Sequence, residues 1–328
     1  MQRSNKLNYI PAIPPTPPAW SVTARYYHVA KMQAKPIPHI ILTIDAGGTT
    51  VRFRLECDGR LLHDDWSIPA SPDGNPPVFL SGLPKPDIVV AGITKVSRPG
   101  VVDAWKHALD FHFPAAEHMI VPDFELAAAA SIDRSGAVML LAGTGSLACV
   151  FDGNTLVRVG GRGWEYGDEG SGAFITTEAV RRCVRSLDGM LPTAPLLNRI
   201  TEAADTTDAG VFATWALSQA DVDGRGFLLP LIADAASEGD SDAINLLHGA
   251  GGWLARLAHT AHQKIALQTD IIHVRAVGGL WETGPFIGDA TVAALQKWFA
   301  TVDFERFAGS HLSGGRRLAA KSDYLQPD

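Results

Sequence analysis

The sequence predicts an α/β fold built from two related halves. The first observation is a repeated pattern: an apolar run, a turn rich in glycine and threonine, a second run and an Asp-Gly pair. The pattern covers 39–59 and returns at 137–153, almost a hundred residues later. The second observation is that short apolar strands alternate with helical periodicity between the two copies, which is typical of layered α/β folds.

The first copy predicts two antiparallel strands joined by a hairpin. Apolar residues occupy alternate positions from Val51 to Cys57, which is the period of a strand with one buried face. Asp58-Gly59 then favours a tight hairpin, because both residues tolerate positive φ. In a P-loop or a dinucleotide-binding motif the glycine turn opens a helix instead. Either turn alone also fits a hairpin without a ligand, but the pair favours a two-sided phosphate clamp.

The remaining elements follow from periodicity. Between the two copies we expect a strand at 87–92, a helix at 101–111, a strand at 117–121 and a helix at 124–132. Beyond Gly172 helices dominate, at 173–187, 228–236 and 242–267, before a strand at 271–277 that leads through Gly278-Gly279 into another helix. The predicted domains are therefore 39–135 and 136–328, with a cleft between them.

The first 38 residues differ in composition from the rest. They hold seven of the 21 prolines, and no acidic residue precedes Asp45. A segment of this kind does not form a packed element, and its basic residues lack the apolar core of a secretory signal. We expect residues 1–38 to be disordered, or to be an extension upstream of a working start at Met32, and exclude them from the fold.

Composition narrows the class of protein. The 328 residues are 46% hydrophobic and 19% charged, which is enough for one large or two medium cores. No apolar run approaches the roughly 18–20 residues of a membrane span. The net charge of -7 argues against nucleic acid or an anionic membrane as the main partner. Cys57, Cys149 and Cys183 are widely spaced, as expected for reduced thiols in a cytoplasmic protein.

Five motifs stand in a specific order along the chain. They are the turn from Asp45 to Thr50, Asp123 at a helix start, the run from Leu141 to Ser146, the run from Gly160 to Gly172, and Val277-Gly278-Gly279. Together they resemble the N-acetylglucosamine and glucosamine kinases, in the superfamily of sugar kinases, heat-shock chaperones and actin. The resemblance extends from residue 39 to the end. It implies two ribonuclease-H-like lobes with an interlobe cleft for ATP and sugar, Mg²⁺ as a cofactor, and a homodimer.

The glycine turns are the expected nucleotide site. Glycine allows backbone N–H groups to approach phosphate oxygens closely, and neighbouring hydroxyls add donors. The expected ATP-binding residues are Gly47, Gly48, Thr49, Thr50, Gly143, Thr144, Gly145 and Ser146, to which the resemblance adds Gly278 and Gly279 against adenine and ribose. Asp45 ends a strand beside the first turn and is placed to hold Mg²⁺ through water. The alternative is that Asp45 only caps the turn.

The resemblance assigns the sugar chemistry. It makes Asp123 the base that accepts the proton of the attacking sugar hydroxyl and a substrate ligand, whereas the residue alone favours a helix N-cap. Many relatives carry asparagine before this aspartate, and Pro122 replaces it here. Asp168 is expected to bind sugar hydroxyls, with a helix N-cap as its alternative. Gly161 and Asn75 complete the expected substrate-binding residues.

The sequence thus predicts a kinase that phosphorylates the 6-hydroxyl of an amino sugar, N-acetylglucosamine first and glucosamine second. One alternative is an ATPase activator of the 2-hydroxyacyl-CoA dehydratase or benzoyl-CoA reductase type, which needs cysteines at a subunit interface for an iron–sulfur cluster. Cys149 and Cys183 fall within a strand and a helix, where we expect no such pair. The other is a nucleotide-sensing regulator. His259 and His262 are expected on a solvated helix face rather than at a metal.

Overall fold

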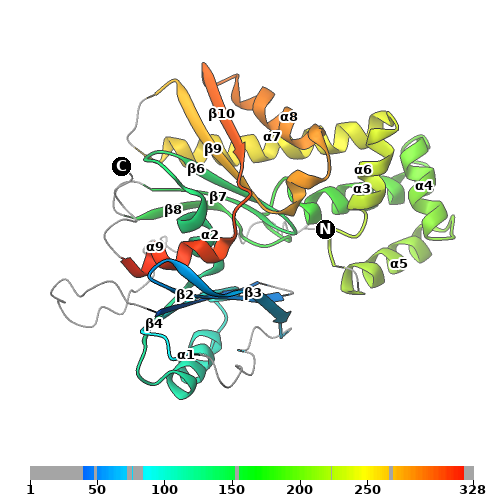
Figure 1. Ribbon diagram of the computed structural model, residues 1–328. Coiled ribbons are helices and arrows are strands. Elements are labelled where there is room, and N and C mark those ends of the chain that lie inside the picture. Colours follow the sequence, from blue (N-terminus) through cyan, green and yellow to red (C-terminus); the bar gives the residue numbers. More distant parts are fainter. Residues whose placement is uncertain are drawn as a thin grey trace, which may run out of the picture. The chain divides into compact units, whose positions relative to one another are not determined.

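Two sheets with matching strand order form the framework of the described structure (Figure 1). The computed structural model describes residues 40–47, 50–71, 76, 84–151, 155–222, 224–265 and 269–320. The first sheet has the order β3-β2-β1-β4-β5 and comprises β1 (Ile40–Ala46), β2 (Thr50–Cys57), β3 (Arg60–Pro69), β4 (Ile88–Ile93) and β5 (Glu117–Pro122). β1, β2 and β3 are antiparallel, whereas β4 and β5 run parallel to β1.

The second sheet repeats this arrangement. It has the order β8-β7-β6-β9-β10 and comprises β6 (Val138–Ala142), β7 (Ser146–Phe151), β8 (Leu156–Gly160), β9 (Ile271–Val277) and β10 (Thr301–Arg306). Its first three strands are antiparallel, and β9 and β10 run parallel to β6. The predicted α/β fold in two related halves is confirmed, and each glycine turn joins the first two strands of its sheet.

The hairpin after the first turn has the predicted geometry. Cys57 pairs with Arg60, and the two residues between them, Asp58 and Gly59, have φ angles of 47° and 78°. Both angles lie in the left-handed region that Asp and Gly tolerate, which suits the twist of a two-residue hairpin. The corresponding Asp152-Gly153 pair of the second copy lies outside the described residues.

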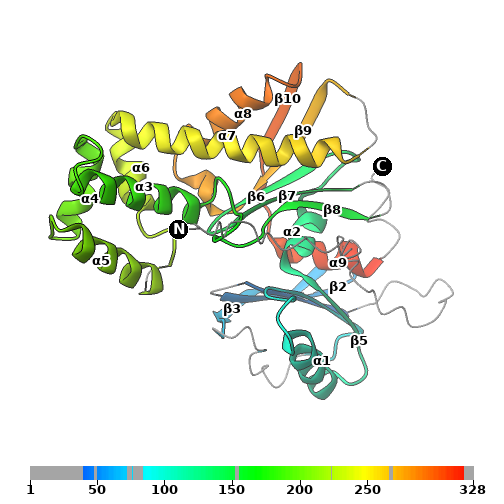
Figure 2. The same ribbon diagram turned by 180° about the vertical axis from the view of Figure 1, so that it is seen from behind.

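Helix α2 (Asp123–Ser131) packs between the two sheets together with α9 (Gly314–Ala320), as Figures 1 and 2 show. Leu126 and Ala129 face the first sheet, in a buried cluster that includes Val90. Ala127 and Ala128 face the second sheet. Since small alanine side chains cover both sides of α2, the two sheets can approach the same short helix closely. The contacts of α2 with both sheets therefore fix the position of Asp123, the residue that begins this helix.

The outer faces of both sheets are covered by other helices. α1 (Val101–His112) covers the first sheet, where Trp105 and Leu109 are buried. Two helices, α3 (Gly172–Leu187) and α7 (Ser241–Gln263), cover the second sheet. Four more helices pack in the same buried cluster: α4 (Pro195–Ala203), α5 (Ala209–Val222), α6 (Leu229–Ser237) and α8 (Pro285–Leu295). Two short 3₁₀ turns, η1 (Gly279–Glu282) and η2 (His311–Ser313), complete the elements. Among the described helices, none has the length and apolar character needed to cross a membrane.

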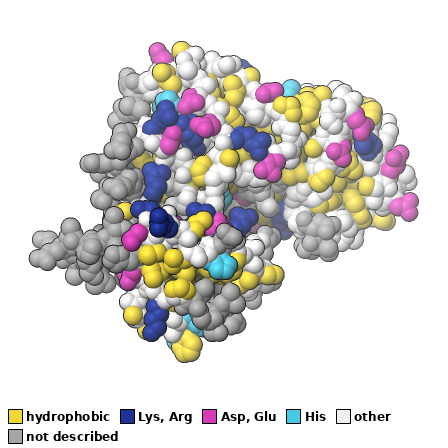
Figure 3. All heavy atoms as spheres, in the orientation of Figure 1, with side chains coloured by type: hydrophobic (Ala, Val, Ile, Leu, Met, Phe, Trp, Pro, Cys, Tyr) yellow, Lys and Arg dark blue, Asp and Glu magenta, His cyan; other side chains and the backbone are white. Residues whose placement is uncertain are grey.

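Two arginines hold the end of α2. Arg275 on β9 has a side chain only 4% exposed, and its guanidinium donates to Asp133 at 3.0 and 3.1 Å and to Asp303 at 3.2 Å. Arg317 from α9 donates to the carbonyl of Ile132 at 2.6 Å. Figure 3 shows charged side chains gathered over β9 and β10, where Arg275 and Asp303 lie. These contacts fix the connection between α2 and β6.

The structure differs from the sequence prediction at several elements. The predicted helix at 242–267 ends at Gln263, and the chain after Gly278 first forms η1 before α8 begins at Pro285. β10, α4, α5 and α9 were not predicted at all, and β8 was implied only by the hairpin signal at Asp152-Gly153. Gly315 of α9 packs directly on Thr43 of β1, where a Cβ atom would overlap the threonine side chain. The chain thus returns to the first sheet at its end, a contact without any local sequence signal.

Candidate functional site

The second glycine turn is fixed against the start of α3. The N–H of Gly143 donates to the carbonyl of Gly145 at 2.9 Å, and Gly172 and Ala173 donate to the carbonyls of Gly143 and Thr144 at 2.8 and 3.2 Å. A Cβ atom at Gly172 would lie 3.2 Å from the Gly143 carbonyl. The start of α3 therefore lies so close to the second turn that a side chain at Gly172 would have little room.

The first turn is described in part. Gly47 donates its N–H to the carbonyl of Thr50 at 3.0 Å, which closes the turn between β1 and β2. Gly48 and Thr49, which the sequence places in the same turn, lie outside the described residues, as does Asn75. Their expected roles in binding ATP and sugar therefore stay predictions.

The chain after β9 lies beside the second turn. Gly278 has φ 103°, and a Cβ atom there would overlap the carbonyl of Ala142, the residue just before Gly143. Gly279 opens η1, where the indole of Trp281 donates to the carbonyl of Val277 at 2.9 Å. The structure thus brings Gly278 to the second turn, although about 130 residues separate the two in sequence.

Asp45 and Asp123 are neighbours at the carboxyl edge of the first sheet. Asp45 pairs with Gly92 of β4, which pairs in turn with Val121 of β5, so the parallel strands end side by side. A Cβ atom at Gly92 would lie 3.4 Å from the Cα of Asp123. Glycine in β4 therefore lets the first turn of α2 close on the sheet.

The surroundings of Asp123 favour its protonated form. Burial raises the pKa of Asp123, and the negative charge of Asp45 raises it further, while the Phe124 N–H and His311 act in the opposite direction. The Phe124 N–H donates to Oδ1 of Asp123 at 2.9 Å. The N-cap position of α2 is held by Pro122 and not by Asp123. A carboxylate with a raised pKa beside a second carboxylate is a common arrangement for a general base.

Asp168, which belongs to the loop before α3, packs against the second glycine turn. Its carboxylate accepts the backbone N–H groups of Ser146 and Gly163, and a Cβ atom at Gly145 would lie 2.9 Å from its Oδ2. Burial is the main cause that raises the pKa of Asp168, and these hydrogen bonds oppose it. The N-cap of α3 is Ser171, whose hydroxyl accepts from Phe174 at 3.2 Å. The alternative interpretation of Asp168 as that N-cap is therefore wrong.

The backbone at Asp168 is unusual. Its φ of 57° lies in the left-handed region, which non-glycine residues adopt mainly where the surroundings require it. Gly161, at φ 66°, packs on Leu147, with a hypothetical Cβ 3.0 Å from Leu147 Cδ2. Both ends of the loop from Gly161 to Ser171 thus lie close to the second turn.

Ser146 has a different position from the one expected for a phosphate ligand. Its N–H is used by Asp168, and its hydroxyl donates to the carbonyl of Glu169 at 2.7 Å. The side chain is buried. In this arrangement Ser146 positions the loop that carries Asp168, while the N–H groups of Thr144 and Gly145 are the nearest candidates for phosphate.

Sequence reasoning missed three charged residues near these aspartates. His311 of η2 places Nδ1 3.6 Å from Oδ2 of Asp45. Arg158 of β8 stacks its guanidinium over the ring of Phe124, 5.0 Å from the centroid, and the charges of Asp123 and Asp168 act on it. Glu125 lies on α2 close to Arg158. An arginine in the strand just before the Gly160–Gly172 motif was a usable signal; for His311 there was none.

Glu125 is a buried carboxyl whose ionisation should destabilise the fold. Burial raises its pKa from 4.5 to about 7, against the opposing charge of Arg158. Since its folded pKa is above the unfolded value, stability should fall as pH rises from about 4.5 to 7, by up to roughly 3 kcal/mol. Glu125→Gln should remove this decrease, which urea unfolding between pH 5 and 8 would measure. An unchanged pH slope in the variant would contradict the assignment.

Two further expectations concern histidine and cysteine. His262 is buried and contacts the Phe299 ring edge-on at 5.0 Å, and His259 stacks on Trp298 at 4.3 Å. The expectation of a solvated face is therefore wrong, because α8 and the chain after it cover these positions. Cys149 and Cys183 are fully buried, in β7 and α3.

Comparison with known proteins connects this geometry to sugar kinases. The profile of the BadF/BadG/BcrA/BcrD ATPase family matches residues 86–300. Glucosamine kinase GspK of Vibrio cholerae is 25% identical over 253 residues, covering 70% of this chain and 83% of the relative. Candidate N-acetylglucosamine kinases of known structure share the fold. The enzyme candidate from Chromobacterium violaceum has a TM-score of 0.65 and 20% sequence identity, and the match covers 87% of this chain and 100% of the relative. That from Porphyromonas gingivalis has a TM-score of 0.60 at 17% identity, covering 86% and 99%.

Proposed function

The chain belongs to the BadF/BadG/BcrA/BcrD ATPase family, and within it we propose that the protein is an ATP-dependent kinase acting on an amino sugar. Two observations carry the proposal: Asp45 and Asp123 lie together at the edge of the first sheet, and Asp168 lies against the second glycine turn, with Arg158 in electrostatic reach of both Asp123 and Asp168. Asp45 and Asp123 are electrostatically coupled, and Asp168 is bound to the turn itself. The likeness to a glucosamine kinase and to the fold of N-acetylglucosamine kinases supports the choice of substrate class.

Phosphoryl transfer depends mainly on the positioning of the substrates and on the neutralisation of phosphate charge, and each group of site residues has one of these roles. In the proposal, the N–H groups of Thr144 and Gly145 in the second turn hold the ATP phosphates, with the first turn on their other side, and Gly278 and Gly279 lie against the nucleoside. Asp168 accepts sugar hydroxyls. Asp123 takes the proton from the 6-hydroxyl as its oxygen attacks the terminal phosphorus and ADP leaves.

Asp45 suits a magnesium site. It is 6% exposed, and the nearest nitrogen atoms of Arg52 and His311 lie 3.7 and 3.6 Å from its Oδ2, beyond direct hydrogen-bond distance. A carboxylate oxygen of this kind is a ligand that Mg²⁺ prefers, either directly or through water. When bound, Mg²⁺ would neutralise phosphate charge.

The cysteines favour a kinase over an iron–sulfur activator. Cys149 and Cys183 have no exposed surface at which a second copy could share a cluster. Burial raises the pKa of Cys149, and that of Cys183 to about 12, so neither is a ready thiolate ligand.

A coupled ADP-release assay over hexoses and amino sugars tests the proposal. We expect release that depends on N-acetylglucosamine first and glucosamine second, with the 6-phosphate identified by ³¹P NMR. ATP hydrolysis that no sugar stimulates would contradict it, and iron–sulfur absorbance in the purified protein would favour the activator.

Substitution of Asp168 should act mainly on sugar affinity. Asparagine tolerates the left-handed backbone at this position, so Asp168→Asn removes the charge without straining the backbone. Asp168→Ala would remove the carboxylate and strain the backbone at the same time. We expect the sugar KM to rise about tenfold or more in Asp168→Asn, with a smaller change in the ATP KM. Initial-rate kinetics with each substrate varied would measure this. An unchanged sugar KM would count against Asp168 as a sugar ligand.

A further inference from the structure

Arg52 lies on β2, close to the first glycine turn, and has no role in the site as described so far. Its neighbours Val51 and Phe53 belong to the buried cluster under α1, so the alternation of the strand turns Arg52 to the opposite face. Arg52 pairs with Asp45 across the antiparallel strands β1 and β2, and directly opposed residues of such a pair lie on the same face. The side chain of Arg52 is therefore on the face of the first sheet that carries Asp45 and packs against α2.

The donors of the Arg52 guanidinium are available to a ligand. The side chain is 57% exposed, and Nη1 lies 3.7 Å from Oδ2 of Asp45, too far for a hydrogen bond. Arg54, two residues along the same strand, is different, because two hydrogen bonds of 2.7 and 2.8 Å fix it to Asp65. Among the described residues, none accepts a hydrogen bond from Arg52. Arg52 can thus bind a ligand without breaking a hydrogen bond within this part of the protein.

The terminal phosphate of ATP is the group that the proposed function brings to this position. If Asp123 takes the proton of the sugar hydroxyl, that hydroxyl and the phosphorus that it attacks must lie close to the Asp123 carboxylate. Asp45 is close as well: a Cβ atom at Gly92, the β4 partner of Asp45, would lie 3.4 Å from the Cα of Asp123. Arg52 therefore lies beside the two carboxylates that would face the transferred phosphate.

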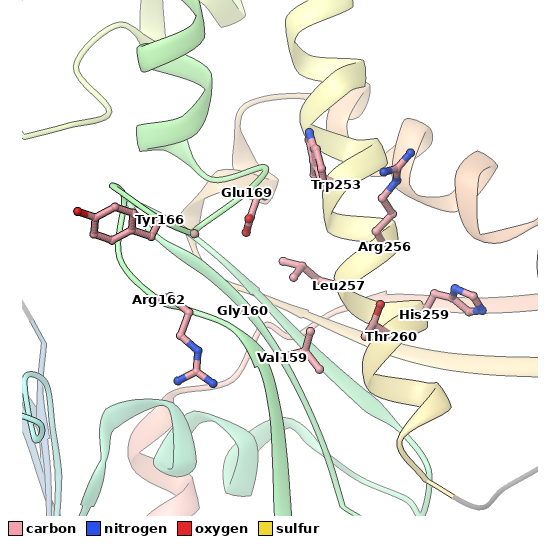
Figure 4. Close-up of a pocket in the computed structure, with 11 residues that line it drawn as sticks. Val159, Gly160, Arg162, Tyr166, Glu169, Trp253, Arg256, Leu257, His259 and Thr260 are labelled. Atoms are coloured by element: carbon pink, nitrogen blue, oxygen red, sulfur yellow. The ribbon is translucent and has the colours of Figure 1, made fainter. Parts of the chain in front are cut away.

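The arginines of the second half lie toward the sugar side of the site. Burial, followed by the positive charge of Arg162, lowers the pKa of Arg158, while the charges of Asp123 and Asp168 oppose this effect. In Figure 4 Arg162 borders a cavity of about 420 Å³ between its loop and α7, and its guanidinium points away from α7. Arg158 is thus the cation near the proposed sugar ligand, and a different cation is needed beside Asp45.

Two cationic side chains lie beside Asp45, and Arg52 is the better phosphate ligand of the two. The other is His311, whose Nδ1 is 3.6 Å from Oδ2 of Asp45. Arginine keeps its positive charge throughout the physiological pH range, and its planar guanidinium presents paired donors that match two oxygens of one phosphate. Two carboxylates and a terminal phosphate repel each other, so a fixed cation at Arg52 would offset this repulsion.

We propose that Arg52 binds the terminal phosphate of ATP and that this contact lets the site distinguish ATP from ADP. The inference rests on the nucleotide site of the proposed function. ADP has no phosphate at this position, so it binds without the contact. Arg52 holds the group to be transferred beside Asp123, whereas Arg158 acts from the sugar side.

Calorimetric titration of the full chain with Mg²⁺ and without sugar tests this inference, with the β,γ-imido analogue of ATP and ADP as the two probes. We expect the wild type to bind the analogue more tightly than ADP. Arg52→Gln should weaken binding of the analogue about tenfold to a hundredfold and change the affinity for ADP less than about twofold. Arg52→Lys keeps the charge but loses the planar donors, so its loss should be intermediate. Arg60→Gln removes an exposed arginine from the far end of the same hairpin; it is the matched control and should bind both probes as the wild type does.

A preference for the analogue that persists in Arg52→Gln would overturn the inference, as would equal affinities of the wild type for the two probes. Equal weakening of both probes would also overturn it, because it would assign Arg52 to the positioning of Asp45. Thermal melting verifies folding of each variant, and Arg52→Lys decides the question if Arg52→Gln is unstable.

Binding without sugar separates this result from the kinase proposal. A preference for the analogue that depends on Arg52, without phosphorylation of any sugar, would sustain this inference and refute the kinase. Sugar phosphorylation together with an unchanged preference in Arg52→Gln would refute this inference alone.

Discussion

Asp123→Asn should lower kcat about a hundred- to ten-thousand-fold, while the sugar KM changes little. The substitution keeps the size of the side chain and an oxygen for the Phe124 N–H, but it removes the proton acceptor. In the proposal sugar affinity depends mainly on Asp168, which the change does not touch. Steady-state kinetics, together with sugar binding to the inactive variant, measures both quantities.

The pH profile provides an independent test of Asp123. Only the ionised carboxylate can accept a proton, and burial with the nearby Asp45 raises its pKa. Wild-type kcat/KM should therefore rise with pH through that raised pKa, and the residual activity of the variant should lack this rise. Asp103→Asn, on the exposed side of α1, is the control and should keep both rate and profile. Near-normal turnover of Asp123→Asn would show that another group is the base.

Arg158→Gln should lower kcat about a hundredfold, with a smaller effect on the sugar KM. Its guanidinium stacks on Phe124, next to the proposed base, and is exposed to the charges of Asp123 and Asp168. Phosphoryl transfer places negative charge in this region, and a fixed cation there lowers the barrier. Arg158→Lys keeps the charge but loses the planar donors and the stacking, so an intermediate rate is expected.

A second measurement separates this role of Arg158 from a structural one. Arg158 lowers the pKa of Glu125, so its removal should move that pKa above about 7. The pH dependence of stability would then shift upward in Arg158→Gln. Arg181→Gln, in an exposed ion pair on α3, serves as the control. A variant that melts earlier but turns over normally per folded molecule would assign Arg158 a packing role alone.

The agreement between sequence and structure is best where the signal is local. Alternation at 51–57 and the Asp58-Gly59 pair both depend on neighbouring residues, and β2 with its hairpin forms as predicted. The same applies to α1 and β9, whose periodicity or apolar character is uninterrupted. β8 was implied only by the hairpin signal before it. Leu156 and Arg158 face α2 and Val157 and Val159 face the other side, so its own residues show no alternation of apolar and solvent-exposed positions.

Side-chain environments were less accessible to prediction. His259 and His262 have ordinary helical spacing, and only the packing of Phe299 and Trp298 against α7 buries one and stacks the other. For Asp168 the sequence left a helix cap open as the alternative to a sugar ligand. The structure instead assigns that role to Ser171 and turns the Asp168 carboxylate toward Ser146.

The sequence by itself determined the α/β class and the duplication, because strand alternation and glycine turns are local patterns that can be recognised wherever they recur, and the family resemblance singled out the aspartates of the candidate site. Only the tertiary structure decided which charges surround those aspartates. Parallel strands bring Asp45 to Asp123, β8 brings Arg158, and the returning chain end brings His311. A pKa depends on burial and on charges within a few ångströms, and such proximity arises only when distant segments pack together.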